Sequence, residues 1–362
     1  MRWPRGRAQR WWPGSVGAAA LLVSLVVLVV AACTPTVASA QDVPDDSGRG
    51  LSAAALDSAL TALRSADWNE RHGALLRINR AYTDTLPGAL LPRLVDLLAR
   101  EAREIASHEG DEDFGEYYMA LVLTAVRTGD ARVIPGIIAV GGIGVSSGVT
   151  SFVASQGRTM LPVLDSLLSA GEDHASDVTE AYALMYARHG ARLSRVDSSA
   201  VLQRLLRAAR HQSPSVRGRV AYSAGRGPIV ELLPLVADLA VTDTAWMFNQ
   251  YIVRAHAAEA LPAVQRAQAA MPVPELINRL LLLTDAACGE SGAATAAACG
   301  DLGANIAEAS RLVAAGQPRL AVKSLDTYSR TVRRLGAGGG MPRLTVVTLD
   351  GTARAILARL AA

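Results

Sequence analysis

Residues 90–98 read LLPRLVDLL, and this stretch decides the fold. Its leucines recur at spacings of three and four residues, which places them on one face of a helix: Leu90, Leu91, Leu94, Leu97 and Leu98. Pro92 stands near the start, where a helix tolerates proline because the N–H groups of the first turn have no intrahelical partner. The stretch therefore predicts an amphipathic helix that buries its leucine face.

The same pattern returns along the chain. An aliphatic residue followed by proline opens an apolar segment at five places: Leu91-Pro92, Ile134-Pro135, Leu161-Pro162, Leu233-Pro234 and Leu261-Pro262. The two-residue alternation typical of strands is almost absent. The composition agrees, because 50% of the 362 residues are hydrophobic and only 4% are aromatic, as in helices that pack through Ala and Leu. We therefore expect an all-α chain of irregular helical hairpins.

Two segments carry an arginine four residues after a helix-capping residue. They read Asp67-Trp68-Asn69-Glu70-Arg71 and Ser213-Pro214-Ser215-Val216-Arg217. Through these residues the chain resembles the HEAT-repeat family over residues 51–270, and paired helices of that family stack into an α-solenoid. The resemblance implies that Arg71 and Arg217 are structural ladder residues, which bond to neighbouring turns.

The C-terminal part, residues 275–362, follows a different pattern. The segment 312–316 ends in glycine, and apolar residues follow at Ala321, Leu325 and Tyr328. This arrangement is similar to FIMAH, a small helical module at the C-termini of many exported prokaryotic proteins. The resemblance implies a small C-terminal helical module after the solenoid.

The first forty residues follow the order of a bacterial export signal. Four arginines precede an apolar run of about 15 residues, which is shorter than the roughly 17 to 25 residues of a membrane-spanning helix. Two processing sites fit: a lipobox at 30–33, in which Cys33 is lipidated, and cleavage after Ala40. The sequence thus predicts a signal peptide at 1–40, a flexible lead-in at 41–50, and a mature chain in the periplasm or cell envelope.

The charge of the mature chain is close to neutral. Without residues 1–40 the chain carries 32 Lys and Arg against 33 Asp and Glu. It has no block of basic residues and no interleaving of basic and aromatic residues, so we expect no nucleic-acid partner. The net charge of the mature chain does not favour binding to an anionic membrane surface either. Membrane contact is therefore expected only through the signal or a lipid on Cys33.

Cys288 and Cys299 enclose a stretch of Gly, Ala and Ser. In an oxidising compartment this pair can close the loop as a disulfide, and the alternative is two buried free thiols. A metal site is the weaker interpretation, because no second ligand pair with zinc-like spacing lies nearby. The cysteine pattern favours the disulfide.

Acidic residues between 101 and 116 raise the question of a calcium site. An EF-hand loop that starts at Asp111 fails, because Gly115 and Val122 occupy positions that require oxygen ligands. The run is better interpreted as a solvated turn, and we expect neither a metal nor another cofactor.

One string matches a catalytic motif. Residues 144–148 read GVSSG, which fits the G-x-S-x-G elbow of serine hydrolases, with Ser146 as nucleophile, Asp165 or Asp238 as orienting acid and His256 as base. The elbow requires a parallel sheet beneath it, and the sequence predicts none. A Gly/Ser connection between helices is favoured, and the hydrolase stays as an alternative.

Several aromatic residues are expected on helices that follow inter-repeat turns. That position lies on the concave surface by which solenoids bind peptides, although it also fits ordinary core packing. The candidates are Trp68, Tyr117, Tyr118, Tyr182, Trp246 and Tyr251.

Together these observations predict an exported, non-catalytic interaction scaffold at the bacterial cell envelope, which binds a protein or peptide on a solenoid surface. A serine hydrolase that uses Ser146 is one alternative. A passive helical spacer or structural lipoprotein is the other.

Overall fold

The computed structural model describes residues 50–104, 112–170, 174–289 and 296–361. These residues form sixteen α-helices, some of which are joined by short 3-10 turns, and no strand occurs among them, so the all-α prediction is confirmed. None of the helices in these ranges combines the length and apolar content needed to cross a bilayer. The helices are α2 (Ala53–Ala62), α3 (Trp68–Ala81), α4 (Leu90–Glu104), α5 (Glu112–Arg127), α6 (Ile134–Ala139), α7 (Ser147–Ser155), α8 (Leu161–Ala170), α9 (Ala175–His189), α10 (Arg195–Ala208), α11 (Pro214–Arg226), α12 (Leu233–Thr242), α13 (Ile252–Ala270), α14 (Val273–Gly289), α15 (Ala296–Ala314), α16 (Pro318–Ala337) and α17 (Arg343–Ala361).

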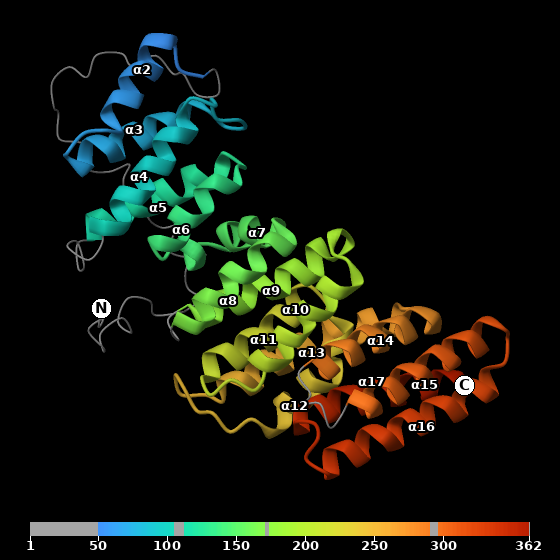
Figure 1. Cartoon of the computed structure of the whole chain (residues 1–362). Coiled ribbons are helices and arrows are strands. Elements are labelled where there is room, and N and C mark those ends of the chain that lie inside the picture. Colours follow the sequence, from blue (N-terminus) through green and yellow to red (C-terminus); the bar gives the residue numbers. More distant parts are fainter. Residues whose placement is uncertain (1–49, 105–111, 171–173, 290–295, 362) are drawn as a thin grey trace.

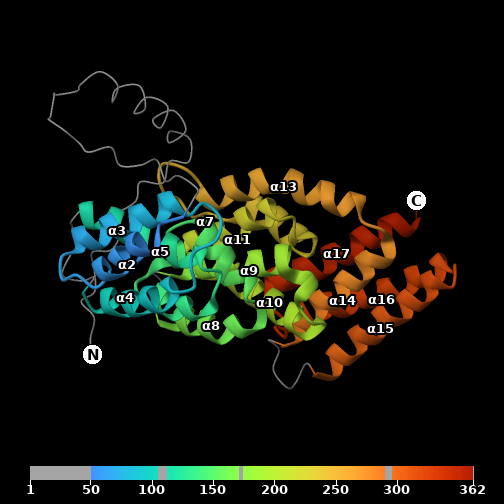
Figure 2. The ribbon, with the colours of Figure 1, turned by 90° about the horizontal axis from the view of Figure 1, so that it is seen from above.

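The helices stack in chain order into an elongated body (Figure 1). One layer contains α3, α5, α7, α9, α11 and α13, each of which contacts the next. Helices between them form a second layer, in which α4 contacts α6 and α10 contacts α14. Figure 2 shows this elongated stack from above. Because neighbours in sequence are neighbours in space, the architecture is that of a helical solenoid.

Four helices close the C-terminal end. In this group α14, α15, α16 and α17 pack in succession, and α17 returns to contact α14. The group is joined to the stack because α14 also packs on α10 and α17 on α12. The Cys288–Cys299 disulfide connects α14 to α15, as the sequence predicts.

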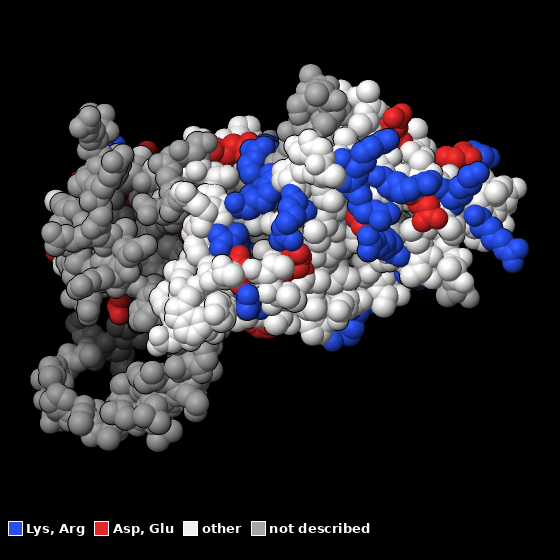
Figure 3. All heavy atoms as spheres, turned by 90° about the horizontal axis from the view of Figure 1, so that it is seen from below, with Lys and Arg blue, Asp and Glu red and all other residues white. Residues whose placement is uncertain are grey.

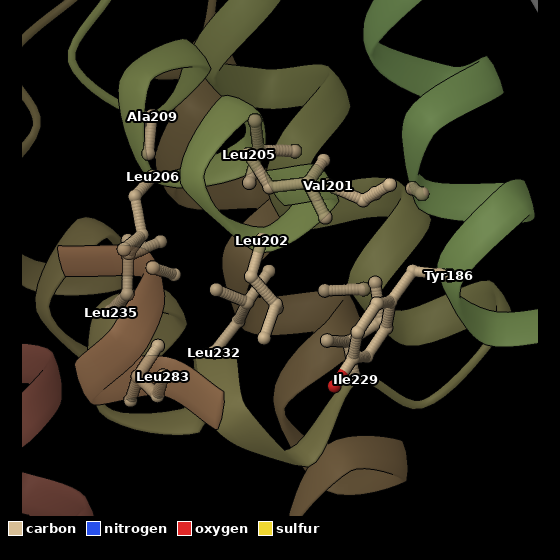
Figure 4. Close-up of a cluster of buried hydrophobic side chains, with 14 of the residues drawn as sticks. Tyr186, Val201, Leu202, Leu205, Leu206, Ala209, Ile229, Leu232, Leu235 and Leu283 are labelled. Carbon is tan, nitrogen blue, oxygen red and sulfur yellow. The ribbon is translucent and has the colours of Figure 1, made fainter. Parts of the chain in front are cut away.

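Two hydrophobic cores stabilise the chain. The first gathers apolar side chains from Ala59 to Val149, and the second extends from Ile134 to Ile356. They overlap at α6 and α7, where Phe152 packs against both. Figure 4 shows part of the second core, in which leucines of α10 meet Leu232, Leu235 and Leu283. The second core runs without interruption from the solenoid into the C-terminal helices.

Glycine permits a close contact between α11 and α13. A Cβ placed on Gly225 of α11 would lie 2.7 Å from the Cα of Ala260 on α13. No real Cβ tolerates that approach, so α11 and α13 pack at this separation only because residue 225 has no side chain.

Four of the five proline pairs stand at the start of a helix, and the fifth does not. Pro92, Pro135, Pro162 and Pro234 stand in the first turns of their helices, as predicted. The expectation that Pro262 opens a helix is wrong, because it lies inside α13. Buried Val253, Ala257, Ala260 and Val264 form one face on both sides of this proline. Packing of that face stabilises the helix beyond what the missing N–H removes.

Candidate functional site

Arg71 and Arg217 make the same contacts in two parts of the stack. Nη1 of Arg71 donates to the carbonyls of Ser65 and Ala66 at 2.9 and 2.8 Å. Nη1 of Arg217 donates in the same way to the carbonyls of His211 and Gln212, at 2.7 and 2.8 Å. Each arginine therefore fixes the turn that precedes its own helix.

Arg71 also belongs to a buried cluster with Glu101 and Tyr117. Its Nη2 lies 2.9 Å from Oε1 of Glu101, and its Nε donates to the Tyr117 hydroxyl at 2.9 Å. The Tyr117 hydroxyl donates in turn to Oε1 of Glu101 at 2.8 Å. All three side chains are buried, and burial raises the pKa of Tyr117 well above its ordinary value. Tyr117 is thus a core residue joining α3, α4 and α5, and its assignment to a binding surface is corrected.

Tyr182 repeats this arrangement with Asp165 and Arg204. The Tyr182 hydroxyl donates to Asp165 at 2.7 Å, and Arg204 contacts both oxygens of the same carboxylate. The hydrogen bonds from Arg204 lower the pKa of Asp165 below its ordinary range. Tyr182 is buried, so it too belongs to the core rather than to a binding surface.

A third cluster joins Tyr186 of α9, Glu231 and Arg279 of α14. The Tyr186 hydroxyl donates to Glu231, and Nη1 of Arg279 lies 3.2 Å from the same oxygen. Burial alone would lower the pKa of Arg279, but the adjacent Glu231 carboxylate raises it above its ordinary value. Glu231 is 1% exposed, and these two side chains supply hydrogen-bond partners for its buried carboxylate.

This third cluster lines a hollow of about 600 Å³. The hollow lies between α9, α10 and α14, and its rim carries Arg188, Arg195 and Asn278. Arg195 pairs with Asp285 at 2.7 Å. The lining thus combines several N–H donors with apolar side chains such as Leu193, Leu281 and Leu282. Such a mixture suits a bound segment that carries both acceptor oxygens and apolar groups.

Ser146 caps α7. Its side chain accepts a hydrogen bond from the backbone N–H of Val149 at 3.3 Å, as an N-cap serine does. It lines a hollow of about 260 Å³ together with Asp177 and Glu180, whereas Asp165 is bonded to Arg204 elsewhere. The described residues place no strand before Ser146. The residues that line this hollow include neither Asp165 nor His256.

His256 packs against an aromatic ring instead. Its ring lies 5.6 Å from that of Tyr222, and a Cβ on Gly218 would approach it at 3.2 Å. Burial lowers the pKa of His256 below its ordinary value, so the imidazole is neutral at pH 7.

The glycine of the G-x-S-x-G string has a packing role. A Cβ on Gly144 would lie 2.3 Å from Oδ2 of Asp177, so only glycine allows this carboxylate to approach. Burial raises the pKa of Asp177, and the neighbouring Arg219 opposes that shift. Arg219 itself pairs with Glu180 at 2.9 Å. The contacts of Gly144 and Ser146 thus serve the connection between helices.

Trp246 and Tyr251 lie outside the helices. The expectation that they follow a turn on a helix is wrong, because residues 243–251 form the connection between α12 and α13. Their rings meet edge to face at 4.8 Å, and both are exposed, by 58% and 44%. They are the sequence candidates that the fold leaves most accessible.

Trp68 and Tyr118 are partly buried. Trp68 packs against Phe114 and Tyr117, with ring centroids 6.0 Å apart in both cases. The Tyr118 hydroxyl donates to the carbonyl of Val140 at 2.9 Å, and burial raises its pKa. Both residues therefore support the first core.

Some sequence predictions concern residues outside the described ranges. These are the signal peptide, Cys33 with its lipobox, most of the lead-in, and much of the acidic run near Asp111. Within the described ranges no group of three or more His, Cys, Asp or Glu residues is placed to hold a metal ion.

The tyrosine–carboxylate–arginine clusters were not predicted. Their members lie 16 to 93 residues apart in the chain, and no local motif links them. One signal existed, since tyrosines that recur on apolar helix faces require partners for their hydroxyl groups when buried.

The chain was also compared with known proteins. No protein-family model matches it, and no significant match is found among curated proteins or solved structures.

Proposed function

We propose that this protein is an exported, non-catalytic scaffold of the cell envelope that binds a protein or peptide in the hollow between α9, α10 and α14. The observation that carries the proposal is the donor-rich lining of that hollow. Its volume of about 600 Å³ accommodates several side chains of a partner. Arg188 and Asn278 stand at its rim, so the segment that fits best carries acidic side chains or exposed carbonyl groups.

Site-specific photo-crosslinking in cells tests this proposal. A benzophenone amino acid at Asn278 should crosslink a discrete protein partner, and the yield should fall when Arg188→Glu reverses the charge at the rim. The same probe at Arg266, which is exposed on α13 outside the hollow, serves as the control. Equal crosslinking from both positions, or none from Asn278, would count against the proposal.

The hydrolase alternative has its own test. Since Ser146 acts as a helix cap, we expect no labelling of the chain by a fluorophosphonate probe. Labelling that disappears in Ser146→Ala would favour the hydrolase. The spacer alternative would be favoured if an unrelated helical segment replaced residues 51–270 without loss of function.

A further inference from the structure

The connection between α12 and α13 ends in a strained turn. Met247 and Gln250 bond to each other through backbone hydrogen bonds of 2.9 and 3.0 Å, and the two residues between them have positive φ, 51° at Phe248 and 60° at Asn249. Asparagine tolerates this conformation, but a bulky residue such as phenylalanine rarely adopts it. Phe248 is nevertheless 78% exposed, so no packing of its ring repays the strain. Strained residues of this kind cluster at positions that serve a function.

The base of this turn is fixed. Arg217 holds the Asp243 carboxylate, and Nε of Arg254 donates to the Asp243 carbonyl at 2.5 Å. The Arg254 guanidinium also lies 4.7 Å from the centre of the Tyr251 ring, which packs against Trp246. Trp246 and Phe248 are therefore presented by an anchored turn, which lies at the lower left of Figure 1 beside α11 and α12.

Basic side chains gather on the same side of the molecule. A hollow of about 440 Å³ beside the turn is lined by Arg210, Arg217 and Arg343, of which Arg217 pairs with Asp243 and Arg343 with Asp238. Farther along, α16 carries five exposed basic residues and one exposed acid, and all of them fall within about 100° of arc on the helix: Arg319, Lys323, Asp326, Arg330, Arg333 and Arg334. Figure 3 shows Lys and Arg collected on the side of the molecule that is seen from below, which we call the lower face.

The total charge of the mature chain is close to neutral, but the charges are distributed unevenly along the chain. Residues 41–180 contain 21 acidic and 11 basic residues, whereas residues 181–362 contain 12 acidic and 21 basic residues. The half that carries the aromatic turn and α16 is thus strongly positive. A negatively charged surface would attract that half and repel the other.

We propose that the lower face docks onto the surface of an anionic lipid bilayer, with Trp246 and Phe248 entering the interface and the basic residues of α16 contacting the headgroups. Exposed aromatic rings prefer the boundary between headgroups and acyl chains, and clustered Lys and Arg bind anionic lipids. This role goes beyond the protein-binding hollow, which lies between other helices, and does not depend on it.

Vesicle co-sedimentation with residues 41–362, which contain every described helix, tests the proposal. The chain should bind vesicles containing phosphatidylglycerol, bind pure phosphatidylcholine weakly, and dissociate as salt is raised. Trp246→Ala with Phe248→Ala should reduce binding at least about tenfold. Lys323→Gln with Arg330→Gln and Arg334→Gln should reduce it by a similar factor and weaken the salt dependence. Trp246 fluorescence should shift to the blue on binding, and the shift should be absent in Trp246→Phe.

Matched controls separate this docking from general effects. Arg64, Arg77 and Arg80 are exposed in the first repeats, so their replacement by Gln removes three charges from the acidic half. Val196→Ser removes an exposed apolar side chain from α10. Neither control should change binding. Equal binding to neutral and anionic vesicles, equal losses in the controls, or a benzophenone at position 248 that crosslinks a protein instead of lipid would overturn the proposal.

Discussion

The guanidinium of Arg217 on α11 holds the carboxylate of Asp243 at the end of α12 through hydrogen bonds of 2.7 and 3.2 Å. The Asp243 side chain is 6% exposed, so this contact is nearly closed to solvent. Burial alone would raise the pKa of Asp243, but the hydrogen bonds from Arg217 and from the backbone N–H of Ala245 lower it below its ordinary value. One arginine therefore joins the turn before α11 to the base of the α12–α13 connection.

Arg217→Ala should lower the free energy of unfolding by about 3 kcal/mol, because it leaves the Asp243 carboxylate buried without its main partner. Urea denaturation measures the loss. In the double variant Arg217→Ala with Asp243→Ala, the free energy of unfolding should fall by less than the sum of the losses in the two single variants. Additive losses would show that the two side chains do not stabilise the fold through each other.

Asp177→Asn should stabilise the protein at neutral pH. The raised pKa of Asp177 means that the folded state binds this proton more tightly than the unfolded chain does. Protonated Asp177 therefore makes its full contribution to the stability of the fold below the ordinary pKa of about 3.9. That contribution is lost as the pH rises through the pKa of Asp177 in the folded state. Thermal melting at a series of pH values should place the variant above the parent at pH 7, with a difference that shrinks below about pH 4.

Asp165→Asn is the control, and it should change the melting temperature at pH 7 in the opposite direction. Arg204 lowers the pKa of Asp165, so this carboxylate stabilises the fold above its ordinary pKa, and that contribution is lost as the pH falls through the folded-state value. Its removal should therefore lower the melting temperature at pH 7. Equal responses of the two variants at every pH would contradict the assignment.

Gly225→Ala should destabilise the fold by about 1 to 3 kcal/mol, because the new methyl group must displace α13 at Ala260. Gly73 on α3 provides the comparison, since a Cβ there meets nothing within 4 Å. Gly73→Ala should stabilise the helix by about 0.5 to 1 kcal/mol. Denaturant melts of the two variants should move in opposite directions, and a loss in both would mean that helix packing does not explain residue 225.

Loss of the Cys288–Cys299 disulfide should cost about 3 kcal/mol, the value expected for a loop of this length in the chain-entropy model. Thermal melting with and without a reducing agent measures it. The double variant with serine at both positions should melt at the temperature of the reduced parent and should not respond to the reducing agent. If the reducing agent lowered the melting temperature of that variant as well, the disulfide would not be the cause of the loss.

The spacing of residues within a segment is enough to predict where most helices lie, but it does not predict which helices contact each other. The leucine spacing over 90–98 and the proline pairs predict elements that the structure contains, because both depend only on residues within one helix. Pro262 failed as a helix start because the packing of α13 stabilises an interior proline. The expectation that Trp246 lies on a helix is wrong because the Arg217 and Arg254 contacts, made from α11 and α13, fix residues 243–251 as a turn.

The candidate sites depend still more on distant contacts. Trp246 and Tyr251 could be selected from the sequence because they are aromatic residues in a chain that has few. Their exposure, and the burial of Tyr117 and Tyr182, follow from helices that are distant in the sequence. The sequence totals do not predict the basic side chains of the lower face, because a summed charge carries no information on where the charges lie.

The division of the interior into two cores that overlap at α6 and α7 governs how the molecule opens. In a stacked architecture each part is stabilised mainly by its neighbours, so the smaller core at the N-terminal end can exchange its amide hydrogens independently of the larger one. Hydrogen exchange should therefore resolve two cooperative units, with protection falling from α9–α14 towards α2. A partner bound between α9, α10 and α14 would leave the first unit free to open and close.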